Sequence, residues 1–369
     1  MQTTRKTKIG IIGCGNISGI YCKSGERFRN LELIACADMD VSRAKARAEE
    51  FKIPRACSVK ELLAMPEIEI VINLTIPAAH AEIALACLES GKHVYGEKPL
   101  GITRTEGQKV LALAQSKNLR VGCAPDTFLG GGIQTCRKLI DDGWIGEPIA
   151  ATAFMASHGM ETWHPDPTPF YQPGAGPVFD MAPYYFTALN FLIGPVKSVA
   201  SSTRITFPER LVTSAPKYGM KVKVNTPTHV AGVLNFQNGA IGTMVMSFDV
   251  WAAELPRIEI YGTTGTLSVP DPNTFGGPVK VNRAGAGAWT VMPLTHGYIE
   301  NARGLGVSDM ASGIANNRPH RASGELSYHV LDAMQGLLDA SDSRKHVELS
   351  STCAQPKPLP MGIREGEID

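Results

Sequence analysis

Apolar and polar positions follow two alternating patterns over the first third of the chain. Short apolar runs of the kind that form buried strands lie at 8–12, 31–37, 68–74, 92–95 and 119–123. Stretches of helical period lie between them, at 42–51, 58–65, 81–90 and 103–117. Strands that alternate with helices predict a parallel sheet with crossover helices.

The pattern changes after residue 124 and becomes rich in β-strands. Strands are predicted at 149–158, 230–236, 241–248, 257–261 and 266–269, and helices at 133–142, 182–193 and 325–340. Asn238-Gly239 and Thr264-Gly265 predict two hairpins. Loops are expected at 161–177, 276–287 and 304–319, and the proline-rich tail after Ser350 is expected to wrap a surface or to be loosely ordered. We therefore expect an α/β domain over 1–124 and, over 125–369, a domain with an open, mainly antiparallel sheet and a terminal helix able to pack back on the first domain.

A glycine-rich segment follows the first strand, Gly13-Cys14-Gly15-Asn16-Ile17-Ser18-Gly19. In the dinucleotide-binding pattern G-x-G-x-x-G, Gly13 makes the tight turn and Gly15 lets the backbone approach a pyrophosphate. Ser18 stands in the third position, so the match is imperfect. We expect Gly13, Gly15, Asn16 and Ile17 to bind the cofactor.

Asp38 follows the second predicted strand, where a carboxylate reaches the adenosine ribose hydroxyls. Asp38 could instead cap the next helix, but Asp40 is better placed as a cap. A carboxylate at this position repels a 2′-phosphate, so the expected cofactor is NAD rather than NADP. Arg43, five residues further on, is the one residue that could weaken this preference for NAD.

Composition narrows the class of partner. The formal net charge is +1 and basic runs are missing from the sequence, so nucleic acid is not expected as a partner. No apolar run is long enough for a membrane span, and the N-terminal segment does not resemble a signal peptide. The eight cysteines form no CxxC pair, which favours buried free thiols in a reducing cytoplasm over disulfides or a metal site.

Further motifs identify a family resemblance. They are Thr75-Ile76-Pro77 with His80, Gly91-Lys92-His93-Val94 before Glu97-Lys98-Pro99, Gly143-Trp144-Ile145-Gly146, and Ile260-Tyr261-Gly262-Thr263-Thr264-Gly265. Together with the glycine turn, they resemble the Gfo/Idh/MocA oxidoreductases, the family of glucose–fructose oxidoreductase and inositol dehydrogenase. The resemblance implies a Rossmann domain, NAD(P)-linked oxidation or reduction of sugars and polyols, and a homo-oligomer, dimer or tetramer, formed through the open sheet.

The resemblance also implies catalytic residues. The lysine of the family's E-K-P motif lies beside the nicotinamide and the substrate hydroxyl, a role that falls to Lys98, the alternative being a lysine that caps a loop. The family's D-x-x-x-H signature matches Asp180, but Tyr184 replaces the histidine. A tyrosine can accept the proton if a nearby cation lowers its pKa. Asp180 could instead cap a helix, and Tyr184 could be a packed core aromatic.

The remaining site residues follow from strand ends and from polar–aromatic groups. Since ligands bind at the carboxyl ends of parallel strands, the cofactor should be lined by Thr75, Pro77, His80, Glu97 and Lys98. Lys98, Asp180 and Tyr184 are expected to bind the substrate as well as to act in catalysis. Because aromatic faces beside polar groups suit sugar rings, the further candidates for substrate binding are Trp163, His164 and His320. A satisfied loop histidine accounts for His164 about as well, and a salt bridge or helix position accounts for Arg321 and His320.

Three functions remain open from the sequence. The first is an NAD-dependent sugar or polyol dehydrogenase. The second is a glycoside hydrolase or lyase that oxidises its substrate transiently with bound NAD, which a released aglycone would reveal. The third is a non-catalytic regulator that senses NAD or sugar, although both Lys98 and Asp180 are present.

Overall fold

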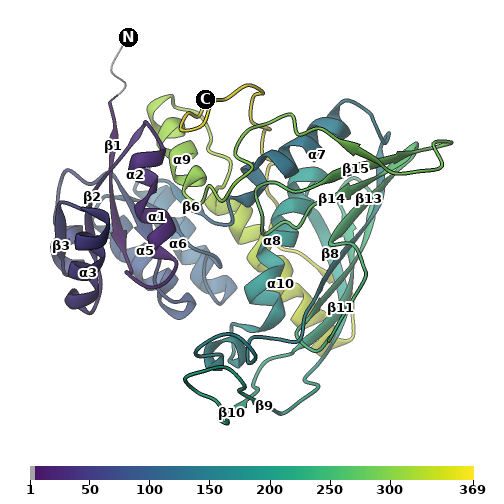
Figure 1. Cartoon of the computed structure of the whole chain (residues 1–369), viewed down its shortest axis with the longest axis horizontal. Coiled ribbons are helices and arrows are strands. Elements are labelled where there is room, and N and C mark those ends of the chain that lie inside the picture. The colour runs from purple at the N-terminus through teal and green to yellow at the C-terminus, as the bar shows by residue number, and fades with distance from the viewer. Residues whose placement is uncertain (1–4) are drawn as a thin grey trace. The chain divides into compact units, whose positions relative to one another are not determined.

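The computed structural model describes residues 5–369, which divide into two compact units (Figure 1). Unit 1 contains the chain up to Gln134 together with Thr295–Tyr328 and Pro356–Asp369. Unit 2 contains Thr135–Leu294 and His329–Gln355. The sequence suggested one boundary at 124, whereas the chain returns to unit 1 twice after leaving it. None of the helices within 5–369 is long and apolar enough to cross a membrane.

Unit 1 is built on a six-stranded parallel sheet in the order β3-β2-β1-β4-β5-β6. Its strands are β1 (Thr7–Ile12), β2 (Leu31–Ala37), β3 (Arg55–Cys57), β4 (Ile70–Asn73), β5 (His93–Gly96) and β6 (Val121–Cys123). The connecting helices are α1 (Ser18–Cys22), α2 (Ser24–Arg27), α3 (Val41–Phe51), α4 (Val59–Leu63), η1 (Pro77–Ala79), α5 (His80–Glu89) and α6 (Arg104–Ser116). The predicted parallel sheet is confirmed, and the short β3 is an addition to it.

Local capping explains where several of these helices begin. The Asp40 side chain accepts a hydrogen bond from the Ser42 amide at the start of α3, as predicted. Ser58 and Glu61 form a reciprocal capping box on α4, and Thr103 begins α6 in the same way. These contacts satisfy amide groups that a helix leaves unpaired at its first turn.

Unit 1 also contains α9 (Leu305–Ala315), which lies in a segment expected to be a loop, so that prediction was wrong. Residues 305–313 are all buried. A helix surrounded by protein shows no polar face, and its glycine, serine and alanine residues therefore carry no helical period. The short helix η2 (Thr127–Leu129) and the first residues of α7 (Gly131–Asp141) complete this unit.

Unit 2 is built on a nine-stranded sheet in the order β16-β15-β14-β13-β7-β12-β11-β8-β17. Its strands are β7 (Pro148–Ala156), β8 (Val196–Arg204), β11 (His229–Phe236), β12 (Ile241–Ser247), β13 (Ile258–Gly262), β14 (Gly265–Val269), β15 (Val279–Arg283), β16 (Thr290–Met292) and β17 (Val347–Glu348). Its pairs are antiparallel except β7 with β12, which is parallel. Both predicted hairpins are confirmed, but β15 occupies the segment 276–287 that was expected to be a loop.

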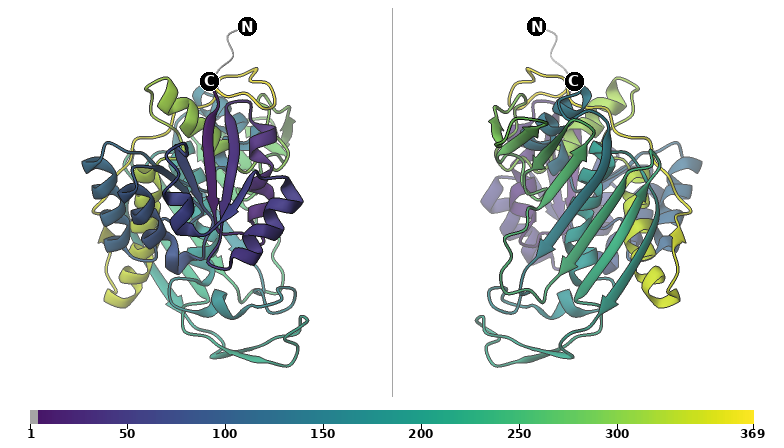
Figure 2. Two further views of the ribbon diagram at one scale, coloured as in Figure 1. Left: turned by 90° about the vertical axis from the view of Figure 1, so that its left-hand side faces the viewer. Right: turned by 90° about the vertical axis from the view of Figure 1, so that its right-hand side faces the viewer.

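Two helices cover one face of this sheet, α8 (Gly176–Leu192) and the part of α10 (Gly324–Ser343) that belongs to unit 2. The other face is open to the viewer in the right panel of Figure 2. Side chains such as Val233 and Ile241 alternate with buried neighbours along β11 and β12 and are 38% and 55% exposed. The predicted open sheet is therefore present.

A small second sheet extends from unit 2. It pairs β9 (Glu209–Leu211) with β10 (Lys221–Lys223), between the end of β8 and the start of β11. The 3-10 helix η3 (Thr168–Tyr171) lies beside β10. Neither strand was predicted, because three-residue strands leave almost no periodic signal.

Candidate functional site

The glycine turn after β1 has the shape that a dinucleotide requires. Gly13 has φ +102°, and a Cβ built on it would lie 2.6 Å from the main chain of Leu74, so this position demands glycine. A Cβ built on Gly15, by contrast, would meet no atom of the described residues within 4 Å. This open space lets a pyrophosphate approach the backbone, so the turn fits NAD.

Asp38 is attached to the glycine turn at the end of β2. Its two carboxylate oxygens accept hydrogen bonds from the Cys14 amide at 2.8 Å and from the Asp40 amide at 3.0 Å, and the residue is 8% exposed. The helix cap is Asp40, as expected. A carboxylate offers about four acceptor positions, so Asp38 retains capacity for ribose hydroxyls.

The ends of β4 and β5 are joined by His80. Its Nδ1 lies 2.7 Å from the Pro99 carbonyl and its Nε2 lies 3.0 Å from the Thr75 carbonyl. Asn73 strengthens this link between the two strand ends, since its Oδ1 accepts hydrogen bonds from Thr75 and its Nδ2 donates to the His80 carbonyl. Burial lowers the pKa of His80. The expected contact of His80 with the cofactor stays a prediction, because in this geometry the ring links two loops.

Glu97 supports the turn that carries Lys98. Its Oε1 accepts a 2.7 Å hydrogen bond from the Tyr21 hydroxyl, and its Oε2 accepts one from the Lys98 amide at 3.1 Å. Burial and the Glu97 charge raise the pKa of Tyr21 well above its ordinary value. Lys98 is half-buried, and its peptide bond to Pro99 is cis. Tyr21, Glu97 and His80 therefore fix the backbone on both sides of this lysine.

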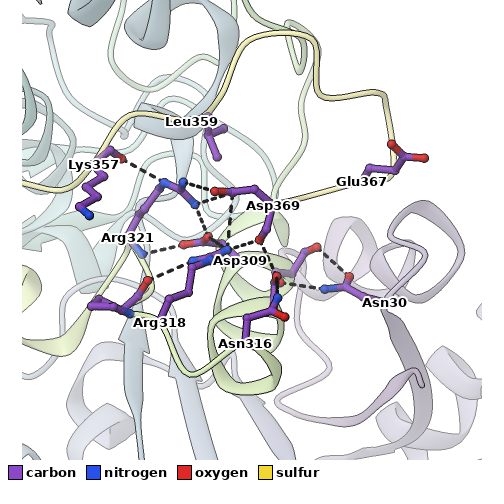
Figure 3. Close-up of polar contacts among 12 residues, drawn as sticks. Asn30, Asp309, Asn316, Arg318, Arg321, Lys357, Leu359, Glu367 and Asp369 are labelled. Carbon is purple, nitrogen blue, oxygen red and sulfur yellow. Dashed lines mark hydrogen bonds and ion pairs between the residues drawn. The ribbon is translucent and has the colours of Figure 1, made fainter. Parts of the chain in front are cut away.

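His320 and Arg321 lie within unit 1, beside β6. The Nε2 of His320 is 3.0 Å from the Val121 carbonyl, and burial lowers its pKa. Arg321 forms ion pairs with Asp309 and Asp369, as Figure 3 shows. The salt-bridge alternative for Arg321 is thus confirmed, and substrate binding by His320 stays a prediction.

The catalytic candidates of unit 2 lie on α8. This helix begins at Gly176 with Ala175 as its N-cap, so Asp180 lies in the second turn and the capping alternative for it is wrong. Tyr184 follows one turn later and is 8% exposed, whereas Asp180 is half-buried. Residues four apart on a helix share a face, so the two side chains can serve one ligand.

Trp163 and His164 lie on the loop before η3. Trp163 is 63% exposed, and the His164 ring packs edge-on against Phe170 with centroids 4.9 Å apart. The Nδ1 of His164 accepts a hydrogen bond from the Asp166 amide at 3.0 Å, so its other nitrogen carries the proton when the ring is neutral. The exposed indole remains a substrate candidate.

A buried ionic cluster that the sequence did not reveal anchors this loop. Arg210 on β9 pairs with Glu161 at 2.9 Å and with Asp249, and all three side chains are at most 7% exposed. The second oxygen of Glu161 accepts a hydrogen bond from Tyr171. Nothing in the spacing of these residues links them, because they come from separate segments.

Asp126 is a second buried group that sequence reasoning missed. It is 1% exposed, and its Oδ2 accepts hydrogen bonds from the amides of Gly304 at 2.9 Å and Gly306 at 3.0 Å. Burial raises the pKa of Asp126 to about 6. Its place just after β6, at the carboxyl end of the sheet, is the signal that could have identified it.

Comparison with known families and structures agrees with this geometry. The family model described as "Oxidoreductase family, NAD-binding Rossmann fold" matches residues 7–124, and the model "GFO/IDH/MocA C-terminal domain" matches residues 133–268. Among solved structures, levoglucosan dehydrogenase in complex with NADH and L-sorbose has a TM-score of 0.80 at 21% identity and covers 94% of this chain and 100% of its own, which shows a shared fold.

Curated relatives are named dehydrogenases and reductases. A 1,5-anhydro-D-fructose reductase from Ensifer adhaerens is 27% identical over 70% of this chain and 74% of its own length. A myo-inositol 2-dehydrogenase from Thermotoga maritima is 22% identical over 70% and 74%. A trans-1,2-dihydrobenzene-1,2-diol dehydrogenase from Bos taurus is 25% identical over 71% and 74%. The two family models together span most of the chain, which therefore belongs to the Gfo/Idh/MocA family of NAD-binding oxidoreductases.

Proposed function

We propose that the protein is an NAD-dependent dehydrogenase that transfers hydride between a secondary alcohol of a sugar, glycoside or polyol and the nicotinamide. The observation that carries this proposal is the Lys98 turn, which His80 and Glu97 hold at the carboxyl ends of β4 and β5. A braced lysine at the ligand edge of a dinucleotide-binding sheet suits proton transfer. The sugar and polyol activities in the relatives' names support the substrate class.

In this proposal the cofactor supplies the hydride acceptor or donor, and the protein handles the proton. Lys98 stabilises the alkoxide that forms at the substrate oxygen, and Tyr184, in its phenolate form, takes the proton from the substrate hydroxyl. Asp180 orients the substrate or the pair. The support lies in the position of each residue within its own unit and in the family's motifs.

We propose NAD rather than NADP as the working cofactor. Asp38 is fixed by two amides and so presents its charge where a 2′-phosphate would lie. Arg43, which could have accommodated that phosphate, lies 3.7 Å from the Asp40 carboxylate and is 66% exposed. Titration of the protein with NADH and NADPH tests this preference, and equal or tighter binding of NADPH would contradict it.

The substrate class is tested by a panel of sugars, inositols, anhydrosugars and diols, with nicotinamide absorbance as the readout. Turnover of at least one member with NAD supports the proposal, and Lys98→Ala serves as the inactive control. Mass spectrometry of the products would reveal an aglycone if the reaction were hydrolysis or elimination. Binding of NAD without turnover of any member would instead indicate a sensor.

We also propose that the protein forms a homo-oligomer through the open face of the nine-stranded sheet. Exposed apolar side chains such as Val233 and Ile241 on a regular sheet face favour burial against a second copy. Light scattering of the wild-type protein and of Val233→Lys tests this, because a charge at the interface should release smaller species. The cytoplasm is the compartment we propose, since all eight cysteines, which lie within the described residues, are free and buried.

A further inference from the structure

The carbonyl of Gly15, at the centre of the glycine turn, accepts hydrogen bonds from three donors. The Ser18 amide lies at 3.1 Å, the Ser18 Oγ at 2.7 Å and the Arg47 Nη2 at 3.2 Å. Ser18 is fully buried and stands where the dinucleotide pattern has its third glycine. A carbonyl oxygen has two lone pairs, so these donors saturate it and hold it in one direction.

Arg47 is itself held in place on α3. Its Nη1 donates to the Glu50 carboxylate at 2.7 Å, and its guanidinium carbon lies 5.6 Å from the centroid of the Phe51 ring. The side chains of Arg47 and Phe51 lie over Gly19, where a Cβ would be 3.5 Å from the Phe51 ring and 3.6 Å from Arg47. The side chain of Arg47 is only 19% exposed. The arginine thus presents an N–H to the turn with little conformational freedom left.

Ser18 and Arg47, which together hold the Gly15 carbonyl, are called the clamp below. Because the geometry of a peptide bond is fixed, the clamp also sets the direction of the next amide. The Gly15–Asn16 peptide is planar and trans, so the Asn16 N–H points opposite to the Gly15 carbonyl. It therefore points away from Ser18 and Arg47, on an exposed residue. The Cys14 amide is already bonded to Asp38. Asn16 is consequently the amide whose direction the clamp decides.

We propose that Arg47 and Ser18 are positioning residues for the cofactor, because they hold the Gly15 carbonyl so that the Asn16 amide donates to the pyrophosphate. The inference rests on NAD being the ligand of this turn, as in the proposed function. Neither side chain needs to touch the cofactor. Their effect is on the affinity for ligands that contain the pyrophosphate.

The test measures equilibrium binding of NADH by fluorescence and of ADP-ribose and adenosine by calorimetry. Ser18→Ala should weaken NADH and ADP-ribose binding roughly 3- to 10-fold and Arg47→Met roughly 10-fold, the size of one lost hydrogen bond to a neutral or charged group. Adenosine binding should change less than about 2-fold in both, because adenosine lacks the pyrophosphate. The double variant should lose less than the product of the single losses, because both donors act on one carbonyl.

Two further variants separate the clamp from a general effect of positive charge. Lys45→Met removes an exposed cation from the same helix and should leave binding unchanged. Arg47→Lys keeps the positive charge, so full recovery of affinity in this variant would mean simple attraction of the phosphates and would overturn the proposal. Circular dichroism and thermal melts verify folding, and Ser18→Ala, which removes one oxygen, tests the clamp even if Arg47→Met fails to fold.

The failures are distinguishable. If the wild-type protein does not bind NADH, the proposed function and this inference fall together. If it binds NADH but Ser18→Ala binds it within about 2-fold of the wild type, only the clamp is refuted.

Discussion

Replacing Asp126 gives the sharpest test of how unit 1 is held together. Both of its hydrogen bonds, from the amides of Gly304 and Gly306, end on one carboxylate oxygen. Asp126→Asn can place its amide oxygen there and keep both bonds while removing the buried charge. Asp126→Ala instead leaves two buried N–H groups unpaired, each at a cost of about 1–3 kcal/mol. We therefore expect Asp126→Ala to be less stable than Asp126→Asn by about 2–6 kcal/mol.

The charge of Asp126 also makes the free energy of unfolding depend on pH, with a sign that can be worked out. Burial raises the pKa of Asp126 from its ordinary 3.8 to about 6 in the folded protein. The folded state therefore binds the proton more tightly than the unfolded state, and the free energy of unfolding falls as pH rises from about 4 to about 6. The shift corresponds to about 3 kcal/mol, and above that window the contribution is constant.

Urea unfolding of the wild type, Asp126→Asn and Asp126→Ala between about pH 4 and pH 8 measures these terms. The stability of Asp126→Asn relative to the wild type should rise by about 3 kcal/mol across this range, since the amide does not titrate. A constant difference would mean that Asp126 titrates normally in the folded protein. Equal stability of the Ala and Asn variants would show that the two amides do not depend on this side chain.

Three further substitutions test the catalytic proposal and the loop that carries Trp163. Lys98→Ala should lower kcat by roughly 10²–10⁴-fold with little change in NADH affinity, and steady-state kinetics showing normal turnover would return Lys98 to a loop-capping role. Tyr184→Phe should lower kcat by roughly 10²-fold or more, and Tyr184→His should retain activity with a pH optimum moved downward; a fully active Tyr184→Phe would leave the proton to Lys98 alone. Arg210→Met should destabilise the protein by about 3–5 kcal/mol in urea melts, because it leaves Glu161 and Asp249 buried without their cation, and an unchanged midpoint would contradict this.

Much of unit 1 follows from its sequence because its signals are local. The alternation of apolar runs with helical periods predicts the parallel sheet, and caps such as Asp40 and Ser58 act on amides two or three residues away. The turn at Gly13 is encoded in the same way, since its positive φ is a property of one residue. The hairpin at Asn238-Gly239 in unit 2 is a further case.

Other parts of the fold were decided by contacts between distant segments. Helix α9 was missed because it is buried on every side and so lacks an amphipathic period. The strand β15 was missed because a short strand is recognised by its partner β14 more than by its own residues. The start of α8 at Gly176 similarly depends on packing within unit 2 rather than on a capping side chain at Asp180.

The candidate site shows the same division. The sequence by itself determined the types of residue at the ligand edge of the sheet, namely the glycine turn, Asp38 and Lys98, because each belongs to a short contiguous motif. The tertiary structure alone decided what holds them: the ring of His80 between two loops, Arg47 on the Gly15 carbonyl, and Asp126 on the first amides of α9. Such pairs join residues far apart in the chain, so the local sequence around one residue does not predict its partner. Folding brings them within hydrogen-bond distance, and the burial that comes with it lowers the pKa of His80 and raises the pKa of Asp126.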